Sequence, residues 1–393
     1  MDNLVKRTWA QIDLSAIKHN FEEIKKKIKP ETKILCVLKA DAYGHGAEFL
    51  VREYEKLGAD FFGVSNLDEA LQLRKAGAKK SILIFGYTPS SCAKILAQNN
   101  ISQAVFSLEY AKKLQEKCRN DGVKVKAHLK IDTGMSRIGF FAQNPESIKK
   151  SVKEIEKISL MPEIEIEGMF THFSVADDVT NNKDYTLKQI ENFKSVILEL
   201  EKAGIHVPIK HCCNSGGILS FPEMQLDMVR AGVILYGLYP SNEVKNKINL
   251  KPAMQLKTVV SQVKTIPEGT SVSYGRTFVS DRKLKIASVA IGYADGYSIK
   301  FSNNSDMLLH GKRVKVLGRV CMDQLMLDVR DVEDIKEGDE VTVFGYDGEN
   351  YISVEELADK IGTINYEIVC LIGKRVPRIY CEDGSVVGMV SYL

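Results

Sequence analysis

The sequence contains no apolar run long enough for a transmembrane helix, and its charges nearly cancel. Its 393 residues include 54 lysines and arginines and 51 aspartates and glutamates, which gives a net charge of +3. This balance does not indicate binding to nucleic acid or to an anionic membrane. The first twenty residues contain several charges and no apolar core of a secretory signal. We therefore expect a cytoplasmic protein that binds neither nucleic acid nor membrane.

Paired cysteine motifs are also missing. None of the eight cysteines forms a C-x-x-C pair. His211, Cys212 and Cys213 are adjacent, but neighbouring cysteines rarely share one tetrahedral ion, and no second ligand pair follows at zinc-site spacing. We therefore predict free thiols in a reducing compartment and no metal site.

From about residue 30 to 240, apolar runs alternate with helical patterns. Eight runs are typical of buried strands, namely Ile34–Leu38, Phe61–Ser65, Ser81–Phe85, Ser102–Phe106, Val125–Ile131, Glu165–His172, Pro208–Cys212 and Met228–Ala231. Helical patterns between them include Leu67–Ala76, Leu108–Asn120, Pro145–Ile158 and Tyr185–Ala203. Eight strands joined by helices in this length predict a closed parallel (β/α)8 barrel of the TIM type. A doubly wound open sheet is the alternative, but the first turn lacks its G-x-G-x-x-G fingerprint.

A polar, lysine-rich connection at about residues 240–252 ends this pattern. Strand signals dominate beyond it, at Thr258–Val263, Lys285–Ala290, Val314–Val320, Gln324–Val329 and Glu340–Phe344. One helix is predicted, Val354–Ile361, with Ser353 as its N-cap and Glu356 three residues on. The sequence thus predicts an α/β barrel over residues 1–245 and a smaller, mainly β domain over residues 246–393. The extreme N-terminal segment is a candidate to pack with the β domain.

A lysine at the end of the first predicted strand is the most informative single residue. Lys39 follows the run Ile34–Leu38, and Tyr43, Gly44 and Gly46 come soon after it. Desolvation at the rim of a core can make an amine nucleophilic, and such an amine can bind an aldehyde cofactor covalently. A lysine in this position is more often a solvated charge. The remainder of the chain decides between these interpretations.

Barrel enzymes carry their sites at the C-terminal ends of the strands. Polar and ionisable residues follow several predicted strands at that end, namely Lys39, Lys130, Arg137, His172, Asn214, Ser215, Arg230 and Gly232. If the strands are correct, these side chains gather on the face where function is expected.

At these residues the chain resembles the alanine racemases, pyridoxal-phosphate enzymes that interconvert L- and D-alanine. The matching motifs follow in order over nearly the whole chain, at Thr8–Leu14, Lys39–Gly46, His128–Gly139, Gly168–Phe173, Ser273–Gly275, Ile291–Gly296, Gly318–Gln324, Ile364–Glu367 and Arg375–Arg378. The resemblance implies an isomerase that uses pyridoxal 5′-phosphate. It also implies a homodimer that shares active sites between subunits and supplies D-alanine for cell-wall peptidoglycan.

The resemblance implies two catalytic bases, Lys39 and Tyr274. Lys39 would hold the cofactor and act on one face of the substrate Cα, and Tyr274 on the other. Because racemisation removes a proton from one face and returns one to the opposite face, two opposed groups suit it. His172, itself held by Arg230, would support Tyr274 through a hydrogen bond that favours the phenolate.

Other roles carried by the resemblance concern cofactor and substrate. The implied cofactor-binding residues are Lys39, Tyr43, His172, Asn214, Ser215, Arg230, Gly232, Val233 and Tyr366. Arg230 would face the pyridine nitrogen and keep it unprotonated, because arginine retains its own proton. Arg137 and the backbone of Met322 would bind the substrate carboxylate, and Tyr293 and Asp323 would shape the entrance. Lys130 matches a lysine that some members carry as a carbamate, and the sequence leaves open whether it does so here.

The sequence leaves three alternatives. A racemase for serine or for a broader range of amino acids is the nearest, but Tyr366 should leave little room beyond a methyl group. A barrel-type pyridoxal-phosphate decarboxylase would present a carboxylate to the ring nitrogen and a catalytic cysteine in the second domain. Arg230 and the racemase-like surroundings of Cys321 disfavour it. A non-catalytic cofactor-binding barrel would lack the second domain with Tyr274.

Overall fold

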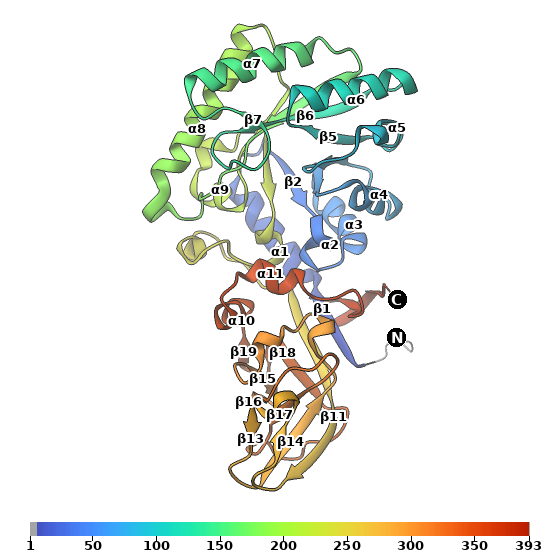
Figure 1. Cartoon of the computed structure of the whole chain (residues 1–393), viewed down its shortest axis with the longest axis vertical. Coiled ribbons are helices and arrows are strands. Elements are labelled where there is room, and N and C mark those ends of the chain that lie inside the picture. The colour runs from blue at the N-terminus through green and yellow to red at the C-terminus, as the bar shows by residue number, and fades with distance from the viewer. Residues whose placement is uncertain (1–5, 393) are drawn as a thin grey trace. The chain divides into compact units, whose positions relative to one another are not determined.

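The computed structural model describes residues 6–392, and the chain divides into two compact units (Figure 1). The barrel unit comprises residues 18–42 and 47–251; the β unit comprises the N-terminal residues through Ile17, residues 43–46 and everything from Pro252 on. The barrel unit thus extends past the predicted end at residue 245. The added residues stay with it because the Asn20 Nδ2 donates to the Lys251 carbonyl (2.9 Å) and the Lys251 amide donates to the Asn20 Oδ1 (2.8 Å).

The barrel unit contains all eight predicted strands. They are β2 (Lys33–Val37), β3 (Phe61–Val64), β4 (Ser81–Ile84), β5 (Ile101–Val105), β6 (Val125–Asp132), β8 (Ile164–Phe170), β9 (Ile209–His211) and β10 (Met228–Ala231), with the short β7 (Phe140–Phe141) paired to β6. They run parallel in the order β10-β2-β3-β4-β5-β6-β8-β9. The Arg230 amide donates to the Cys213 carbonyl (2.9 Å), which joins β10 to the end of β9. The predicted barrel is confirmed.

Helices connect these strands and lie outside them (Figure 1). They are α1 (Leu14–Lys27), α3 (Ala47–Leu57), α4 (Leu67–Lys75), α5 (Ala93–Gln98), α6 (Leu108–Asp121), α7 (Pro145–Ser159), α8 (Val179–Lys202) and α9 (Ser215–Ser220). The segment labelled α2 (Lys39–Tyr43) is a left-handed turn instead. Short 3-10 turns are η1 (Ser90–Cys92), η2 (Pro222–Met224), η3 (Val233–Tyr236) and η4 (Asn242–Lys247). Helix α8 begins before the predicted Tyr185 because the Asp178 carboxylate caps it, accepting from the Asn181 amide.

The β unit is built on one ten-stranded sheet, ordered β19-β18-β15-β16-β17-β14-β11-β1-β20-β21. Its strands are β1 (Thr8–Asp13), β11 (Met254–Ile266), β14 (Leu284–Val289), β15 (Asp306–Leu309), β16 (Lys312–Leu317), β17 (Leu325–Asp328), β18 (Glu340–Asp347), β19 (Asn350–Ile352), β20 (Arg378–Glu382) and β21 (Ser385–Val390). The N-terminal strand β1 pairs antiparallel with β11 and parallel with β20, so this segment belongs to the β unit.

Smaller elements complete the β unit. A separate hairpin pairs β12 (Ser271–Val272) with β13 (Phe278–Val279), and three 3-10 turns are η5 (Tyr274–Arg276), η6 (Tyr293–Asp295) and η7 (Ile299–Phe301). The predicted helix is found as α10 (Val354–Ile361), with the Ser353 hydroxyl accepting from the Glu356 amide (3.0 Å). A second helix, α11 (Asn365–Cys370), was not predicted because so short a segment shows little periodicity.

Two observations on the described part of the chain concern membranes and metals. None of its helices combines the length and the apolar character needed to span a bilayer. Between residues 6 and 392, no three histidine, cysteine or acidic side chains come together as metal ligands would.

Candidate active site

Lys39 begins a left-handed turn directly after β2. Ala40, Asp41 and Ala42 have φ values of 51°, 55° and 54°, and Tyr43 continues with 52°. For residues with a side chain, this conformation costs roughly 1–2 kcal/mol each. Four such residues in a row, with no glycine among them, mark a strained segment at the C-terminal end of a barrel strand. Strain of this kind concentrates at functional sites.

Two carboxylates anchor this left-handed turn. The Glu69 Oε1 accepts a hydrogen bond from the Ala40 amide (2.7 Å), and the Asp41 Oδ1 accepts one from the Ala47 amide (2.8 Å). These bonds tie the turn to α4 and to the first residue of α3. The backbone that directly follows Lys39 is therefore held at two points.

Four basic side chains gather around His172, just beyond β8. Burial, followed by the charges of Arg230, Lys130, Arg137 and Lys39, holds the pKa of His172 well below its usual value. His172 is therefore a neutral imidazole at neutral pH. The predicted residues of the barrel unit thus meet at one site, and its excess of positive charge suits an anionic ligand.

Arg230 is buried at this site, and protein acceptors occupy its terminal nitrogens. Nη2 donates to the carbonyls of Thr171 (2.7 Å) and Cys212 (2.9 Å) and lies 3.4 Å from the His172 Nδ1. Nη1 donates to the carbonyl of His211 (3.2 Å) and lies 3.1 Å from its Nδ1. Burial lowers the pKa of Arg230 to about 10, so the side chain remains charged at neutral pH. No residue between 6 and 392 accepts from its Nε, which is the donor left for a ligand.

Asn214 and Ser215 lie beside His172 and Gly232. The Asn214 Nδ2 donates to the Phe173 carbonyl (3.1 Å) and lies 3.5 Å from the His172 Nε2. Its Oδ1 caps α9, which begins at Ser215. The Gly232 amide donates to the Ser215 hydroxyl (3.1 Å), which joins the ends of β9 and β10. Val233 follows at the start of η3.

Lys130 is a buried amine in β6. Its Nζ donates to the Ile131 carbonyl (2.9 Å) and lies 5.4 Å from the centre of the Phe170 ring. Burial, reinforced by the charge of Arg230, lowers the pKa of Lys130 to about 7. A large share of this amine is therefore neutral, and thus nucleophilic, at neutral pH.

In the β unit, Tyr274 lies at the tip of the β12–β13 hairpin and is 71% exposed. Ser273 before it has a φ of 66°, and its hydroxyl donates to the Arg319 carbonyl (2.6 Å). Gly318 has a φ of 73°, and a Cβ there would lie 2.5 Å from the Val272 carbonyl oxygen. The tip is therefore held against residues 318–319 while the phenol points outward.

Tyr293 and Met322 lie on two backbone segments that contact each other. The Tyr293 amide donates to the Cys321 carbonyl and the Ala294 amide to the Met322 carbonyl, both at 3.0 Å. A Cβ on Gly292 would lie 2.3 Å from both of these carbonyl oxygens, so only glycine fits. Tyr293 is 44% exposed and Met322 52%.

Ionic contacts brace this pair of segments. The Asp295 carboxylate is fully buried and accepts two hydrogen bonds from Arg7 (2.8 and 3.0 Å). Arg375 lies 3.2 Å from the same carboxylate and 2.8 Å from the carboxylate of Asp323. Sequence reasoning missed Arg7 and Asp295, although both lie in or beside quoted motifs. Tyr366, also in the β unit, has its ring centre 6.0 Å from that of Tyr43.

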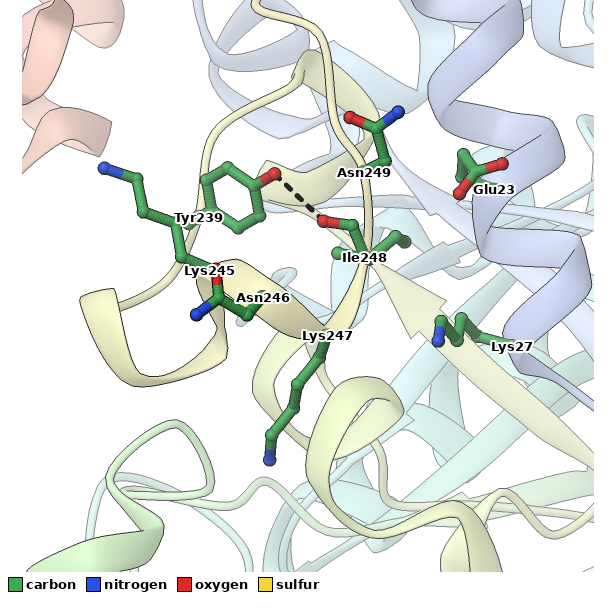
Figure 2. Close-up of a pocket in the computed structure, with 8 residues that line it drawn as sticks. All are labelled: Glu23, Lys27, Tyr239, Lys245, Asn246, Lys247, Ile248 and Asn249. Carbon is green, nitrogen blue, oxygen red and sulfur yellow. Dashed lines mark hydrogen bonds between the residues drawn. The ribbon is translucent and has the colours of Figure 1, made fainter.

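A pocket of about 370 Å³ lies elsewhere on the barrel unit, beside α1 and η4 (Figure 2). Its lining residues are Glu23, Lys27, Tyr239, Lys245, Asn246, Lys247, Ile248 and Asn249. None of them was predicted as a site residue. The Tyr239 hydroxyl donates to the Ile248 carbonyl (3.0 Å; Figure 2), and no predicted site residue contributes to the lining. This pocket is therefore not the candidate site.

Comparisons with known proteins cover almost the full chain. The family described as "Alanine racemase, N-terminal domain" matches residues 12–240, and "Alanine racemase, C-terminal domain" matches residues 253–380. An alanine racemase of Methanococcus maripaludis is 49% identical over 373 residues, which cover 95% of this chain and 98% of that protein.

Solved structures agree with this result. An alanine racemase of Clostridium difficile 630 is 42% identical, covers 100% of both chains and has a TM-score of 0.93. An alanine racemase of Bacillus anthracis with bound L-Ala-P is 36% identical, covers 99% of this chain and 98% of its own, and has a TM-score of 0.92.

Proposed function

This chain belongs to the alanine racemase family, and we propose that it interconverts L- and D-alanine with pyridoxal 5′-phosphate through two bases, Lys39 and Tyr274. The observation that carries the proposal is the group of four basic side chains around His172, one of which, Arg230, lies 3.4 Å from its Nδ1. It combines an amine at a strand end with a donor-only guanidinium. That combination suits an anionic aldehyde cofactor with a ring nitrogen that accepts a hydrogen bond.

The residues present fit the cofactor by their chemistry. Lys39 would hold it covalently, and the Arg230 Nε–H would donate to its ring nitrogen. The rest of the cofactor, including its phosphate, would be held by polar side chains and backbone amides of the other implied residues. These are Tyr43, His172, Asn214, Ser215, Gly232, Val233 and Tyr366. When bound, pyridoxal phosphate supplies an electron-withdrawing ring that makes the substrate Cα–H acidic.

Arg230 sets how strongly that ring can withdraw electrons. Its guanidinium stays protonated at neutral pH, because its pKa of about 10 remains high despite burial. A donor that does not give up its proton leaves the ring nitrogen unprotonated. With the cofactor bound, charge at the substrate Cα would be less delocalised, which would favour rapid return of a proton over side reactions such as transamination.

Two groups of this chain would move the protons at Cα. The Lys39 amine would take or return a proton on one face, and the Tyr274 phenolic oxygen would do so on the opposite face. His172 is a neutral imidazole that accepts from Arg230 at Nδ1, so its Nε2 carries the proton. That N–H would stabilise a phenolate on Tyr274.

Substrate binding would use Arg137 and the Met322 amide on the carboxylate. The neutral fraction of Lys130 supports a carbamate at its Nζ, formed by addition of CO2 with loss of a proton. Such an anion would position Arg137. Spectra of protein supplied with ¹³C-bicarbonate would show a carbamate signal, and this signal should be absent in Lys130→Met.

The exposed side chains of the β unit support a homodimer. Tyr274, Met322 and Tyr293 are exposed residues to which the family resemblance gives roles at the active site and its entrance. We infer that they complete the site in the barrel unit of a second copy. Mixing two inactive variants, one changed at Lys39 and the other at Tyr274, should restore activity at one site per hybrid dimer. Failure of every such mixture to regain turnover would contradict shared sites.

Racemisation itself is the primary test. The purified chain, supplied with pyridoxal phosphate, should convert L-alanine to D-alanine. In the cell, this D-alanine would be made in the cytoplasm and used for peptidoglycan synthesis. Lys39→Ala and Tyr274→Phe should each reduce kcat by about 10²–10⁴-fold, the usual contribution of a general base. Lys33→Ala, at the opposite end of β2, and Tyr346→Phe, at an exposed tyrosine, are matched controls. Full turnover in either base variant would reject the two-base assignment.

A further inference from the structure

A row of hydrogen-bonding side chains crosses the interior of the barrel from Glu167 to Arg230. The Ser102 hydroxyl donates to the Glu167 Oε2 (2.6 Å), and the His128 Nε2 lies 3.1 Å from the same oxygen. The His128 Nδ1 lies 2.9 Å from the His211 Nε2, and the His211 Nδ1 lies 3.1 Å from the Arg230 Nη1. Both imidazoles are completely buried. The row connects β5, β8, β6, β9 and β10.

The direction of every bond in this row follows from Arg230. A guanidinium only donates, so the His211 Nδ1 must accept. Burial, with the charge of Arg230 next, lowers the pKa of His211 well below its usual value, so this imidazole is neutral and carries its proton on Nε2. The His128 Nδ1 then accepts, and the His128 Nε2–H donates to Glu167.

The barrel is shaped to admit both imidazoles. A Cβ at position 168 would lie 2.5 Å from the Cε1 and Nδ1 of His128, so glycine at this position makes room for the ring. Phe170 stacks on His211 with ring centres 5.0 Å apart and planes 16° apart. Phe61 meets His128 edge to face at 6.2 Å. Steric contacts therefore hold the two rings in the orientation that the hydrogen bonds require.

Glu167 is the carboxylate at the end of the row opposite Arg230, and its Oε1 also lies 3.4 Å from the Lys126 Nζ. The acceptors in contact with Arg230 are carbonyls and imidazoles, and within residues 6–392 no carboxylate pairs with it directly. Burial raises the pKa of Glu167, but hydrogen bonds from His128 and Ser102 outweigh it and bring the pKa to about 2. Glu167 is therefore ionised. Hydrogen bonds in a row polarise one another, so its charge strengthens His211 as an acceptor.

We propose that Glu167 is a positioning residue for the racemase site, acting through His128 and His211 to fix the Arg230 guanidinium in the orientation that binds the cofactor. The effect on catalysis rests on the proposed function, whereas the row of hydrogen bonds does not. No proton is transferred along the row. The role resembles that of a buried carboxylate that orients a catalytic imidazole, here extended over two imidazoles to a guanidinium.

Nuclear magnetic resonance of the full-length chain tests the row without activity. With ¹⁵N-labelled histidine, only seven histidines need assignment. His128 and His211 should each carry a proton on Nε2, and both ring N–H groups should exchange slowly with solvent. Glu167→Gln removes the charge at nearly constant volume and should shift the ring N–H of His211, which does not contact Glu167, as well as that of His128. A proton on the His211 Nδ1 in the wild type, or an unshifted His211 signal in the variant, would overturn the proposal.

Kinetics then test the consequence for catalysis. Glu167→Gln should lower kcat roughly tenfold while leaving KM within about twofold, since the orienting group does not touch the substrate. Glu163→Gln is the matched control, because this carboxylate is likewise hydrogen-bonded to side chains, those of Gln115 and Arg119, but lies outside the row. Unchanged kcat in Glu167→Gln would refute the positioning role. If the proposed function fails instead, the wild-type chain will show no turnover. The His211 signal will still differ between the wild type and Glu167→Gln in that case.

Discussion

Arg7 holds Asp295 through two parallel hydrogen bonds of 2.8 and 3.0 Å, although 288 positions separate the two residues. Asp295 is fully buried and also accepts from the Gly292 amide, which precedes Tyr293. The N-terminal segment therefore fixes the backbone that carries a residue of the predicted substrate entrance. We therefore expect this contact to stabilise the β unit.

Arg7→Met should lower the free energy of unfolding of the β unit by about 2 kcal/mol. Removing one partner of a buried ion pair costs roughly 3–5 kcal/mol, and the partial exposure of Arg7 and the remaining contact with Arg375 reduce that figure. Fluorescence of Trp9, the chain's single tryptophan and a buried residue of β1, follows the transition in urea. Arg330→Met, which removes the more exposed pair with Asp328, should cost less than about 1 kcal/mol. Equal losses in both variants would contradict the special role of Asp295.

A glycine substitution in the left-handed turn after β2 should stabilise the protein. Ala40 is exposed and has a φ of 51°, so Ala40→Gly removes strain without opening a cavity. Removing the backbone strain at this position should stabilise the folded state by roughly 1–2 kcal/mol. Glycine loses more conformational entropy on folding than alanine, which costs about 0.5–1 kcal/mol. The free energy of unfolding should therefore increase by up to about 1 kcal/mol. Ala97→Gly, in the right-handed α5, should instead destabilise by about 1 kcal/mol. Circular dichroism during urea unfolding measures both, and the same sign for both would exclude the left-handed turn.

Lys130 predicts a pH-dependent stability of the barrel unit. Its folded pKa is about 7, below the unfolded value, so between these two values the unfolded chain binds more protons than the folded chain. Stability should therefore rise with pH from about 7 toward about 10, with a slope of at most about 1.4 kcal/mol per pH unit from this residue. Urea unfolding in CO2-free buffer should show that Lys130→Met removes this part of the slope. An unchanged slope in the variant would assign the pH dependence to other groups.

Tyr366 predicts substrate selectivity. Its ring lies beside that of Tyr43, and the family resemblance places it near the substrate side chain. Tyr366→Ser should raise the ratio of kcat/KM for serine to that for alanine by roughly tenfold, because a pocket discriminates a small group by about 10–200-fold. Tyr346→Ser changes an exposed tyrosine of the same unit and should leave the ratio unaltered. If the ratio stays constant in Tyr366→Ser, another residue sets the size limit.

The barrel was predictable because its strands are short, continuous apolar runs. Strands such as β4 and β5 are buried on both faces, so hydrophobicity alone marks them. The helix at Val354 was predictable from its cap, since the Ser353 hydroxyl acts locally. These signals act within a few residues, which is the range that inspection of a sequence covers well.

What the sequence did not reveal depends on partners far apart in the chain. His128 contacts His211, which lies 83 positions further along the chain, and the sequence around either residue does not indicate this contact. The turn at Ala40 was hidden for a different reason. Alanine rarely adopts a positive φ, so local preference indicates the opposite of what the anchored backbone imposes.

The placement of β1 constrains the order in which the polypeptide can mature during synthesis. This strand lies between β11 and β20, so Thr8 pairs with Thr258 and Asp13 with Cys381. As the ribosome releases the chain, β1 has no neighbour in the sheet until β11 (Met254–Ile266) has emerged, and it lacks its second neighbour until β20 (Arg378–Glu382) follows. Its unpaired edge is exposed in the meantime, which makes this segment the place where a chaperone would have most to protect.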